Sequence, residues 1–324
     1  MSISVSQYTV SEVDQGKRLD VFLMEHGGQS RAKMQRLIEA GVVTIDAVVT
    51  TKVSQRIRED QVITAGEMPT VITEDSGPKE DLPLPIIPVV AETAEYIVIN
   101  KPAGVLVHPT LAEETGTLAH WIRAHAPPVA TVGEDPARPG IVHRLDREAS
   151  GLMVIAKTPA MFAHLKKQFQ DRKIIKEYTV LVHEQVAKDH DFINFALDRG
   201  TEGRMAARPK FDPLKVDEVP NDQGGKESLT EFDVIKRYTR FTLLKVQIHT
   251  GRTHQIRVHF FAYTHPVVGD ELYFNIKLNR KRDKMLGRLF LHATRLCFED
   301  LGGNTVDYEA VLPQALEDFL KTLN

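Results

Sequence analysis

The sequence has a single cysteine, no long apolar run and no export-type leader. Cys297 cannot form a disulfide within the chain, and its apolar neighbours predict a buried position on a strand. No apolar run approaches the roughly 20 residues that a membrane-spanning helix needs. The first residues lack a basic start followed by an apolar block, so no signal peptide is expected. These features predict a cytoplasmic protein with no membrane partner. Because no dimer stripe is present, we expect a monomer.

The sequence also lacks an excess of positive charge. It has 41 basic and 44 acidic residues, a net charge of −3, which argues mildly against a nucleic-acid partner. The basic residues are clustered, however, with six against two acids in residues 30–58 and six against one in 277–288. Phosphate contacts need only a local patch, although each cluster alone could be a solvated face.

The length and composition predict a folded chain with two unequal domains. Its 324 residues are 42% hydrophobic, which excludes global disorder. We expect a small domain over residues 1–75, a Pro-rich linker over 76–88 and a catalytic domain over 89–324. The stretch 65–88 carries five prolines and an acidic run, a composition that resists regular structure. A polar stretch at 211–225 predicts an exposed loop.

The first domain is expected to contain two short helices followed by a hairpin. Gly27 ends the first helix, Ser30 is a good N-cap for the second, and the hairpin turns near Asp46-Ala47. Apolar residues fall at helical spacing in both helices: Leu19, Phe22 and Leu23 in the first, and Met34, Leu37 and Ile38 in the second.

This segment resembles the S4 RNA-binding module. The matching residues are Arg18-Leu19-Asp20, Ser30-Arg31 and the stretch LIEAGVVTID. The resemblance implies an RNA-binding face, for which Arg31, Lys33 and Arg36 on the second helix are the candidates. The family usually has an Asn-Gly-like turn followed by Lys, and Asp46-Ala47 departs from it. A generic helix-turn-helix or protein-docking unit is the alternative.

The densest chemical signal is GIVHRLDREASGLMVIAKT, residues 140–158. It places Asp146 on a polar loop before an apolar strand that we expect to be central in a sheet. Such a strand is a rigid platform for a charged side chain. Arg144 and Arg147 favour an ionised carboxylate at Asp146, which could act as a nucleophile, a general base or a metal ligand. On these residues alone, a structural Asp–Arg pair is the alternative.

The same stretch closely resembles the central motif of the RluA-type pseudouridine synthases. It departs at Ala149, where the family usually has Thr, so that a hydroxyl is lost. KEYTVLV and TGRTHQIRVH resemble the second and third motifs, and INKPAGVLVHP the first strand and loop; the resemblance runs from about residue 82 to 312. The central motif matches at His143, Arg144, Leu145, Asp146, Ser150, Gly151, Leu152, Ala156 and Lys157.

The resemblance implies a fold, a reaction and the roles of four residues. The fold is α+β: a mixed, mainly antiparallel-sheet pseudouridine synthase domain preceded by a small S4-like α/β domain. The activity is that of an isomerase, an RNA pseudouridine synthase with Asp146 as the catalytic carboxylate. Tyr178 falls on the active-site tyrosine, Arg257 on the arginine that pairs with the aspartate, and Arg144 on the residue that fills or guides the space left by the extracted nucleotide.

No cofactor or metal is expected. The reaction oxidises nothing, and no group is gained or lost. His249, His254 and His259 are spaced by five, which on a strand would place successive side chains on opposite faces. No zinc-type pairing of Cys or His is present elsewhere.

The S4-like module points to the large-subunit ribosomal RNA branch of the family, with pre-ribosomal subunits as a potential partner. Three alternatives stay open on the sequence. They are the same chemistry on transfer RNA, an RNA-binding ribosome-assembly factor with dispensable catalysis, and a carboxylate-dependent hydrolase, which would leave the S4-like module unexplained.

Overall fold

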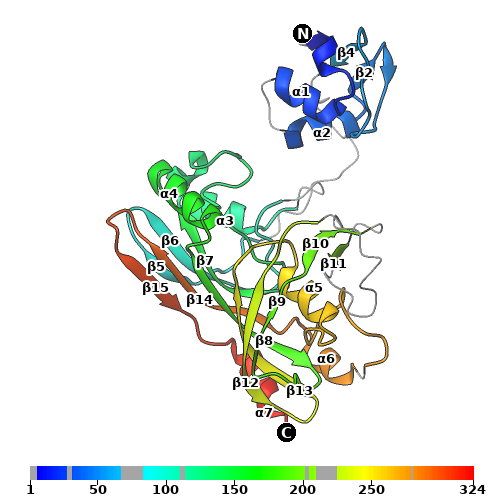
Figure 1. Cartoon of the computed structure of the whole chain (residues 1–324). Coiled ribbons are helices and arrows are strands. Elements are labelled where there is room, and N and C mark those ends of the chain that lie inside the picture. The colour runs from blue at the N-terminus through cyan, green and yellow to red at the C-terminus, as the bar shows by residue number, and fades with distance from the viewer. Residues whose placement is uncertain are drawn as a thin grey trace. The chain divides into compact units, whose positions relative to one another are not determined.

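The computed structural model describes residues 6–27, 31–66, 83–109, 114–200, 204–208, 225–278 and 280–324. The chain divides into two compact units, Met1–Lys79 and Glu80–Asn324 (Figure 1). Much of the predicted linker, and the predicted 211–225 loop apart from Gly225, lie outside the described residues. No helix in the described ranges is both long enough and apolar enough to cross a membrane.

The N-terminal unit is a small antiparallel sheet packed against two helices. The sheet has the order β1-β4-β2-β3. Every apolar residue predicted for the two helix faces is buried in one core with Val10, Val43, Ile57 and Ile63, which confirms both helices. In chain order the elements are β1 (Ser6–Thr9), η1 (Glu12–Asp14), α1 (Leu19–Gly27), α2 (Arg31–Glu39), β2 (Val43–Ile45), β3 (Val48–Val49) and β4 (Val62–Ala65).

The β2–β3 hairpin forms although it lacks the Asn-Gly pair that such turns favour. Asp46 and Ala47 both have positive φ angles, 51° and 64°, as a two-residue turn requires. The Asp46 carboxylate accepts hydrogen bonds from the backbone N–H of Val62 at 2.9 Å and from Gln61 at 3.1 Å. These bonds to the next strand hold a turn that alanine alone would disfavour.

The C-terminal unit is built on one nine-stranded sheet. Its order is β5-β6-β7-β14-β8-β13-β12-β9, with β15 also paired to β14. Neighbouring strands of this sheet are antiparallel except β7 with β14, so the predicted mixed, mainly antiparallel sheet is confirmed. The strands are β5 (Val89–Glu92), β6 (Tyr96–Lys101), β7 (Ser150–Ala156), β8 (Ile175–His183), β9 (His190–Ile193), β12 (Thr230–Arg237), β13 (Phe241–Ile248), β14 (Leu291–Glu299) and β15 (Thr305–Glu309); β10 (Ala196–Arg199) and β11 (Met205–Arg208) form a separate ribbon.

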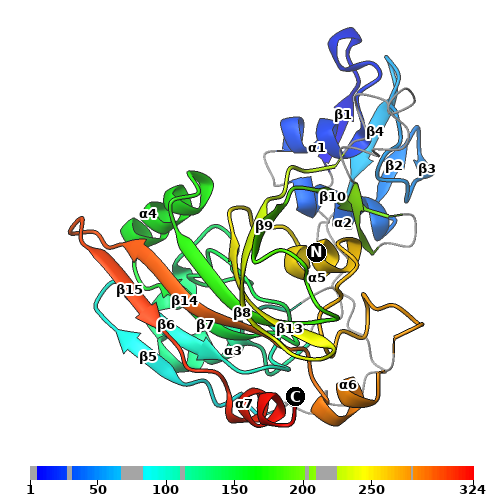
Figure 2. The ribbon, with the colours of Figure 1, turned by 60° about the horizontal axis from the view of Figure 1, so that its bottom comes forward.

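Helices cover both faces of this sheet (Figure 2). Along β8, Val180 and Val182 belong to the main core, while Leu181 belongs to a second core. The main core also contains residues of α3 (Leu118–His125), α4 (Pro159–Gln170) and α5 (Gln255–Ala262), whereas the second is covered by α7 (Gln314–Lys321). The short elements η2 (Pro127–Thr131) and α6 (Lys281–Leu286) complete the unit.

The predicted central strand is β7. All of its residues are buried, and it lies between β6 and β14. Gly151 has a φ of +121°, and an added Cβ there would lie 2.3 Å from the Ala293 backbone of β14. The motif glycine therefore permits the close approach of the two parallel strands. Cys297 is buried on β14, as predicted.

Candidate active site

Asp146 lies on the loop before β7, and His143 connects that loop to the strand through a hydrogen bond. The His143 Nε2 atom accepts a hydrogen bond from the Val154 N–H at 3.0 Å, and the ring stacks on Phe169 at 4.7 Å. Burial, and then the charge of Lys176, lowers the pKa of His143 to about 3, so the imidazole is neutral. His143 is therefore a structural part of the motif.

Lys101, at the end of β6, also holds this loop, through a hydrogen bond to the Arg147 carbonyl. Its ammonium donates to the carbonyl oxygens of Pro102 at 2.9 Å, Val105 at 2.8 Å and Arg147 at 3.2 Å. The side chain is fully buried, and burial lowers its pKa to about 7 against the opposing charge of Asp146. The sequence prediction gave Lys101 no role, although a lysine between an apolar strand and a Pro-Ala-Gly turn was a usable signal.

The Ala149 position shows how the loop folds without the family's threonine. The Ala149 methyl is buried in the main core, and its N–H donates to the Asp146 carbonyl at 3.2 Å. The next residue, Ser150, hydrogen-bonds through Oγ to His292 at 2.8 Å and accepts from Arg288 at 2.7 Å. The loop therefore keeps backbone and serine support where the hydroxyl is lost.

Arg257 on α5 joins Asp146 to a second carboxylate, Asp270. Its Nη1 donates to Asp146 Oδ2 at 3.1 Å, so the contact predicted between these residues is present. Its Nε and Nη2 donate to the two oxygens of Asp270 at 2.7 and 2.9 Å. Burial alone would lower the pKa of Arg257, but the bonds to Asp270 and the charge of Asp146 raise it. The guanidinium is thus a fixed cation that holds both carboxylates through charge-assisted hydrogen bonds.

Asp270 is the residue of this network that the sequence prediction missed. Its side chain is fully buried, and Oδ1 also accepts from the N–H groups of Leu272 and Tyr273 at 2.8 and 2.9 Å. The Tyr273 ring lies 5.4 Å from the Arg257 guanidinium carbon. The segment 270–273 therefore sets the position of Arg257, and through it the geometry at Asp146.

Tyr178 lies on β8 and lines the same cleft as Asp146. Only 5% of its surface is exposed. Burial, followed by the negative charge of Asp146, raises the pKa of its hydroxyl, so the phenol stays protonated at neutral pH. An uncharged ring in this position can stack on a base.

The sequence prediction against a metal site assumed that the three histidines at 249, 254 and 259 lie on one strand. This assumption was wrong. Strand β13 ends at Ile248, and α5 begins at Gln255. His249 pairs with Glu231 at 2.8 Å, and His259 bonds to Thr230 at 2.9 Å. Within the described residues, His249, His254 and His259 are not brought together as a group of potential metal ligands.

His254 stands apart because it faces the catalytic loop. It has a left-handed backbone with φ 53°, which is uncommon for a residue other than glycine. Its Nδ1 lies 3.0 Å from the Tyr273 hydroxyl, and its Nε2 lies 4.0 Å from Asp146 Oδ1. Burial lowers its pKa, partly opposed by Asp146, so the ring is neutral near pH 7.

Asp146, Tyr178, His254 and Arg257 line a cleft of about 620 Å³. Three of the basic residues in its wall have an acidic partner nearby: Lys166 pairs with Glu134, Arg172 with Glu227 and Arg138 with Asp135. Arg144 is exposed in the wall, with Nη1 3.4 Å from His108 Nε2. The basic residues that line the cleft, besides Arg257, are Arg138, Arg144, Lys166, Arg172, Lys176 and Arg252. A basic cleft around one ion-paired carboxylate suits a polyanionic substrate.

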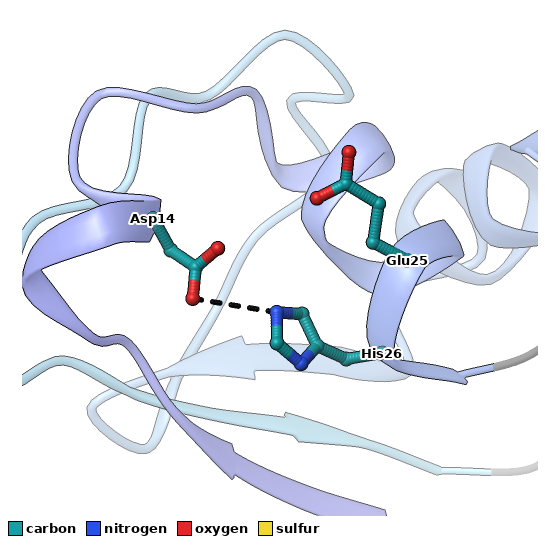
Figure 3. Close-up of side chains that lie close together, drawn as sticks. All are labelled: Asp14, Glu25 and His26. Atoms are coloured by element: carbon teal, nitrogen blue, oxygen red, sulfur yellow. Dashed lines mark ion pairs between the residues drawn. The ribbon is translucent and has the colours of Figure 1, made fainter.

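One cluster in the N-terminal unit has the composition of a metal site (Figure 3). The ligand atoms of Asp14, Glu25 and His26 lie within 4.8 Å of one another. The Lys17 ammonium, however, donates to Asp14 at 2.8 Å and to Glu25 at 2.7 Å, and His26 lies 3.3 Å from Asp14. Lys17 thus already pairs with both carboxylates, and the sequence prediction had not singled out this network.

The predicted RNA face of the N-terminal unit falls on α2, which begins at Arg31. The side chains of Arg31, Lys33 and Arg36 lie outside the described part of the structure, as does Ser30. Their role therefore stays a prediction from the sequence.

The fold and the cleft define an RNA-modifying isomerase once known proteins are compared. Residues 95–262 match the family described as RNA pseudouridylate synthase, and residues 17–63 match the S4 domain. The chain belongs to the RNA pseudouridylate synthase family, whose members are isomerases acting on RNA.

Two relatives show how much of the chain this family covers. An uncharacterized RNA pseudouridine synthase of Aquifex aeolicus (strain VF5) is 40% identical over 79% of this chain and 77% of its own length. The ribosomal large subunit pseudouridine synthase D of Vibrio vulnificus (strain CMCP6) is 32% identical over 97% of this chain and 93% of its own.

Two solved structures are similar to the chain. Human RNA pseudouridylate synthase domain containing 1 has 25% identity and a TM-score of 0.56, over 72% of this chain and 87% of its own. Human RNA pseudouridylate synthase domain containing 4 has 24% identity and a TM-score of 0.60, over 72% and 92%, and shows the shared fold.

Proposed function

We propose that this protein converts uridines to pseudouridines in large-subunit ribosomal RNA, with Asp146 as its catalytic carboxylate. The observation that carries the proposal is the Arg257–Asp146 pair at 3.1 Å, in a basic cleft that Tyr178 also lines. Relatives that share nearly the full length, from Vibrio vulnificus and Buchnera aphidicola, are named ribosomal large subunit pseudouridine synthase D. These names support ribosomal RNA as the substrate.

The isomerisation balances without a cofactor. The N1–C1′ bond of uridine breaks, a C5–C1′ bond forms, and the proton lost from C5 is matched by one gained at N1. A carboxylate can assist by adding to C6 of the base, by assisting departure at C1′ of the sugar, or by taking the 2′ proton. All three routes use the carboxylate of Asp146, to which Arg257 donates a hydrogen bond at 3.1 Å.

Two other cleft residues then act on the nucleotide. The uncharged phenol ring of Tyr178 stacks on the uracil. The uridine must leave its base stack to reach Asp146, at an unstacking cost of a few kcal/mol. Arg144 is exposed in the cleft wall, where it can fill or guide the space that the base vacates.

The N-terminal unit supplies affinity in this proposal, and the C-terminal unit supplies the chemistry. All buried apolar residues of the core around α1 and α2 belong to the first unit, so the second keeps its own cores when the first is absent. Deletion of residues 1–79 is expected to weaken RNA binding yet leave turnover at high RNA concentration. Each lost phosphate contact should lower the log–log salt slope by roughly 0.7 to 0.9.

Binding measured over a range of salt concentrations checks this prediction. Replacing Arg31, Lys33 and Arg36 together by glutamine in the full chain is the matched variant, because it removes charge without removing the fold. It should flatten the slope as well. An unchanged slope in both proteins would mean that this face is only a solvated surface, and that the cleft alone selects the RNA.

Pseudouridine mapping of total RNA, from cells with and without the gene, tests the proposed substrate. The expected result is the loss of one or a few sites in large-subunit ribosomal RNA. Loss of sites only in transfer RNA would keep the chemistry and reject the substrate. An unchanged map, together with a defect in ribosome assembly, would indicate a factor whose catalysis is dispensable.

A further inference from the structure

Lys176 brings to the cleft a positive charge that no carboxylate within the described ranges neutralises at ion-pair distance. It lies on β8 and lines the cleft with Asp146 and Tyr178. By contrast, the cleft residues Lys166 and Arg172 each have an acidic partner. The ammonium of Lys176 is therefore available to an anion that enters from solution.

The geometry of β8 places Lys176 in the cleft wall beside Tyr178. Lys176 and Tyr178 are two positions apart on a strand, so they share a face and lie about 7 Å apart along it. Glu177, between them, pairs with Arg295 at 3.2 Å. The Lys176 Nζ lies 5.3 Å from the centre of the Phe169 ring, and an added Cβ at Gly251 would lie 3.7 Å from it. The ammonium thus lies near both α4 and the loop before α5.

A half-buried ammonium in this place is costly unless an anion joins it. Burial lowers the pKa of Lys176 to about 8, which reflects the penalty on its charged form. The Phe169 ring offsets part of that penalty through a cation–π contact, but an aromatic face compensates less than an opposite charge does.

We propose that Lys176 binds a backbone phosphate next to the uridine that enters the cleft. This inference rests on the proposed function, in which Tyr178 stacks on the base and Asp146 meets the base or the sugar. Lys176 lies two positions from Tyr178 on β8, about 7 Å along the strand. At this distance from the stacked base, the ammonium can meet the phosphate backbone of the same RNA segment. An ammonium binds phosphate as a point charge, whereas a neutral uracil carbonyl would offset less of its desolvation. Lys176 is a binding residue in this account and takes no part in the bond changes.

Salt-dependent binding of a short, fluorescently labelled oligouridylate tests the proposal. The full chain carries Asp146→Asn so that the RNA stays unreacted, with Lys176→Met, Lys176→Arg or Lys173→Met added. Lys173 is the matched control, since it is exposed and lines a separate groove with Cys297 and Phe298.

Lys176→Met is expected to weaken binding about 10-fold. Between about 50 and about 200 mM salt it should also flatten the log–log slope by about 0.7, the value for one contact to a single strand. Lys176→Arg should restore the slope, and Lys173→Met should change neither quantity. An unchanged slope in Lys176→Met would overturn the proposal.

Turnover by chains that retain Asp146 separates binding from chemistry. Lys176→Met should raise KM by a similar factor and keep kcat within about twofold at saturating RNA. A fall in kcat at unchanged KM would overturn the proposal, because Lys176 would then act on the reacting atoms. Binding is measured without turnover, so a chain that forms no pseudouridine but binds RNA through Lys176 would refute the proposed function and leave this inference standing.

Discussion

Replacing Asp146 by asparagine is expected to lower the rate of pseudouridine formation by about 10³-fold or more, equivalent to about 4 kcal/mol of transition-state stabilisation. Asparagine keeps the shape of the side chain and can still accept a hydrogen bond from Arg257. It removes the negative charge that every route through this carboxylate requires. The fold and RNA binding should be largely retained, as thermal unfolding and binding assays would show.

Glu148→Gln is the matched control for this substitution. Glu148 lies on the same loop, its Oε2 is 3.6 Å from Arg257 Nη1, and 53% of its side chain is exposed. Glu148→Gln also replaces a carboxylate by an amide next to Arg257. Glu148, however, has no role at the reacting atoms in this account. Its rate should stay within a few-fold of the wild type. Turnover by Asp146→Asn above a few per cent of wild type would reject Asp146 as the catalyst.

Arg257→Met is expected to reduce both stability and activity, for two separable reasons. Removing the guanidinium leaves the fully buried Asp270 carboxylate without its ion-pair partner. Breaking a buried ion pair on one side costs about 3 to 5 kcal/mol of folding free energy. Asp146 also loses the donor at 3.1 Å that fixes its position, so kcat should fall by about 10²-fold or more.

The double variant Arg257→Met/Asp270→Asn separates these effects. Asparagine at 270 can still accept the backbone N–H bonds from Leu272 and Tyr273, but it carries no buried charge. Denaturant unfolding should therefore show the double variant to be more stable than Arg257→Met, while its kcat stays low. Recovery of activity together with stability would mean that Arg257 serves only the fold.

The sequence predicted the parts of this protein that depend on local pattern. The apolar faces of α1 and α2 follow from helical spacing, and the central position of β7 follows from an apolar run bounded by turns. Asp146 and Arg257 were paired through their motifs, although 111 residues separate them. This pairing came from the resemblance to the family, in which the matching positions of the two motifs lie close together.

Contacts outside the motifs could not be read in this way. Asp270 lies 13 residues after Arg257 and reaches it only because the chain folds back past α5. Of the three carbonyl bonds of Lys101, the one to Arg147 likewise depends on a loop distant in sequence, 46 residues away. The histidine error had a local cause: Gly251 follows the end of β13, and the spacing of Ile256 and Phe260 is helical, so the strand premise should have ended there.

The most direct test of the central claim is genetic rescue read by pseudouridine mapping. Cells that lack the gene would receive either the wild-type chain or the Asp146→Asn chain, expressed to equal levels, and their large-subunit ribosomal RNA would be mapped. We predict that the wild-type chain restores the missing pseudouridines and that the Asp146→Asn chain restores none. Restoration by the Asp146→Asn chain, or sites that are never lost from this RNA, would contradict the account.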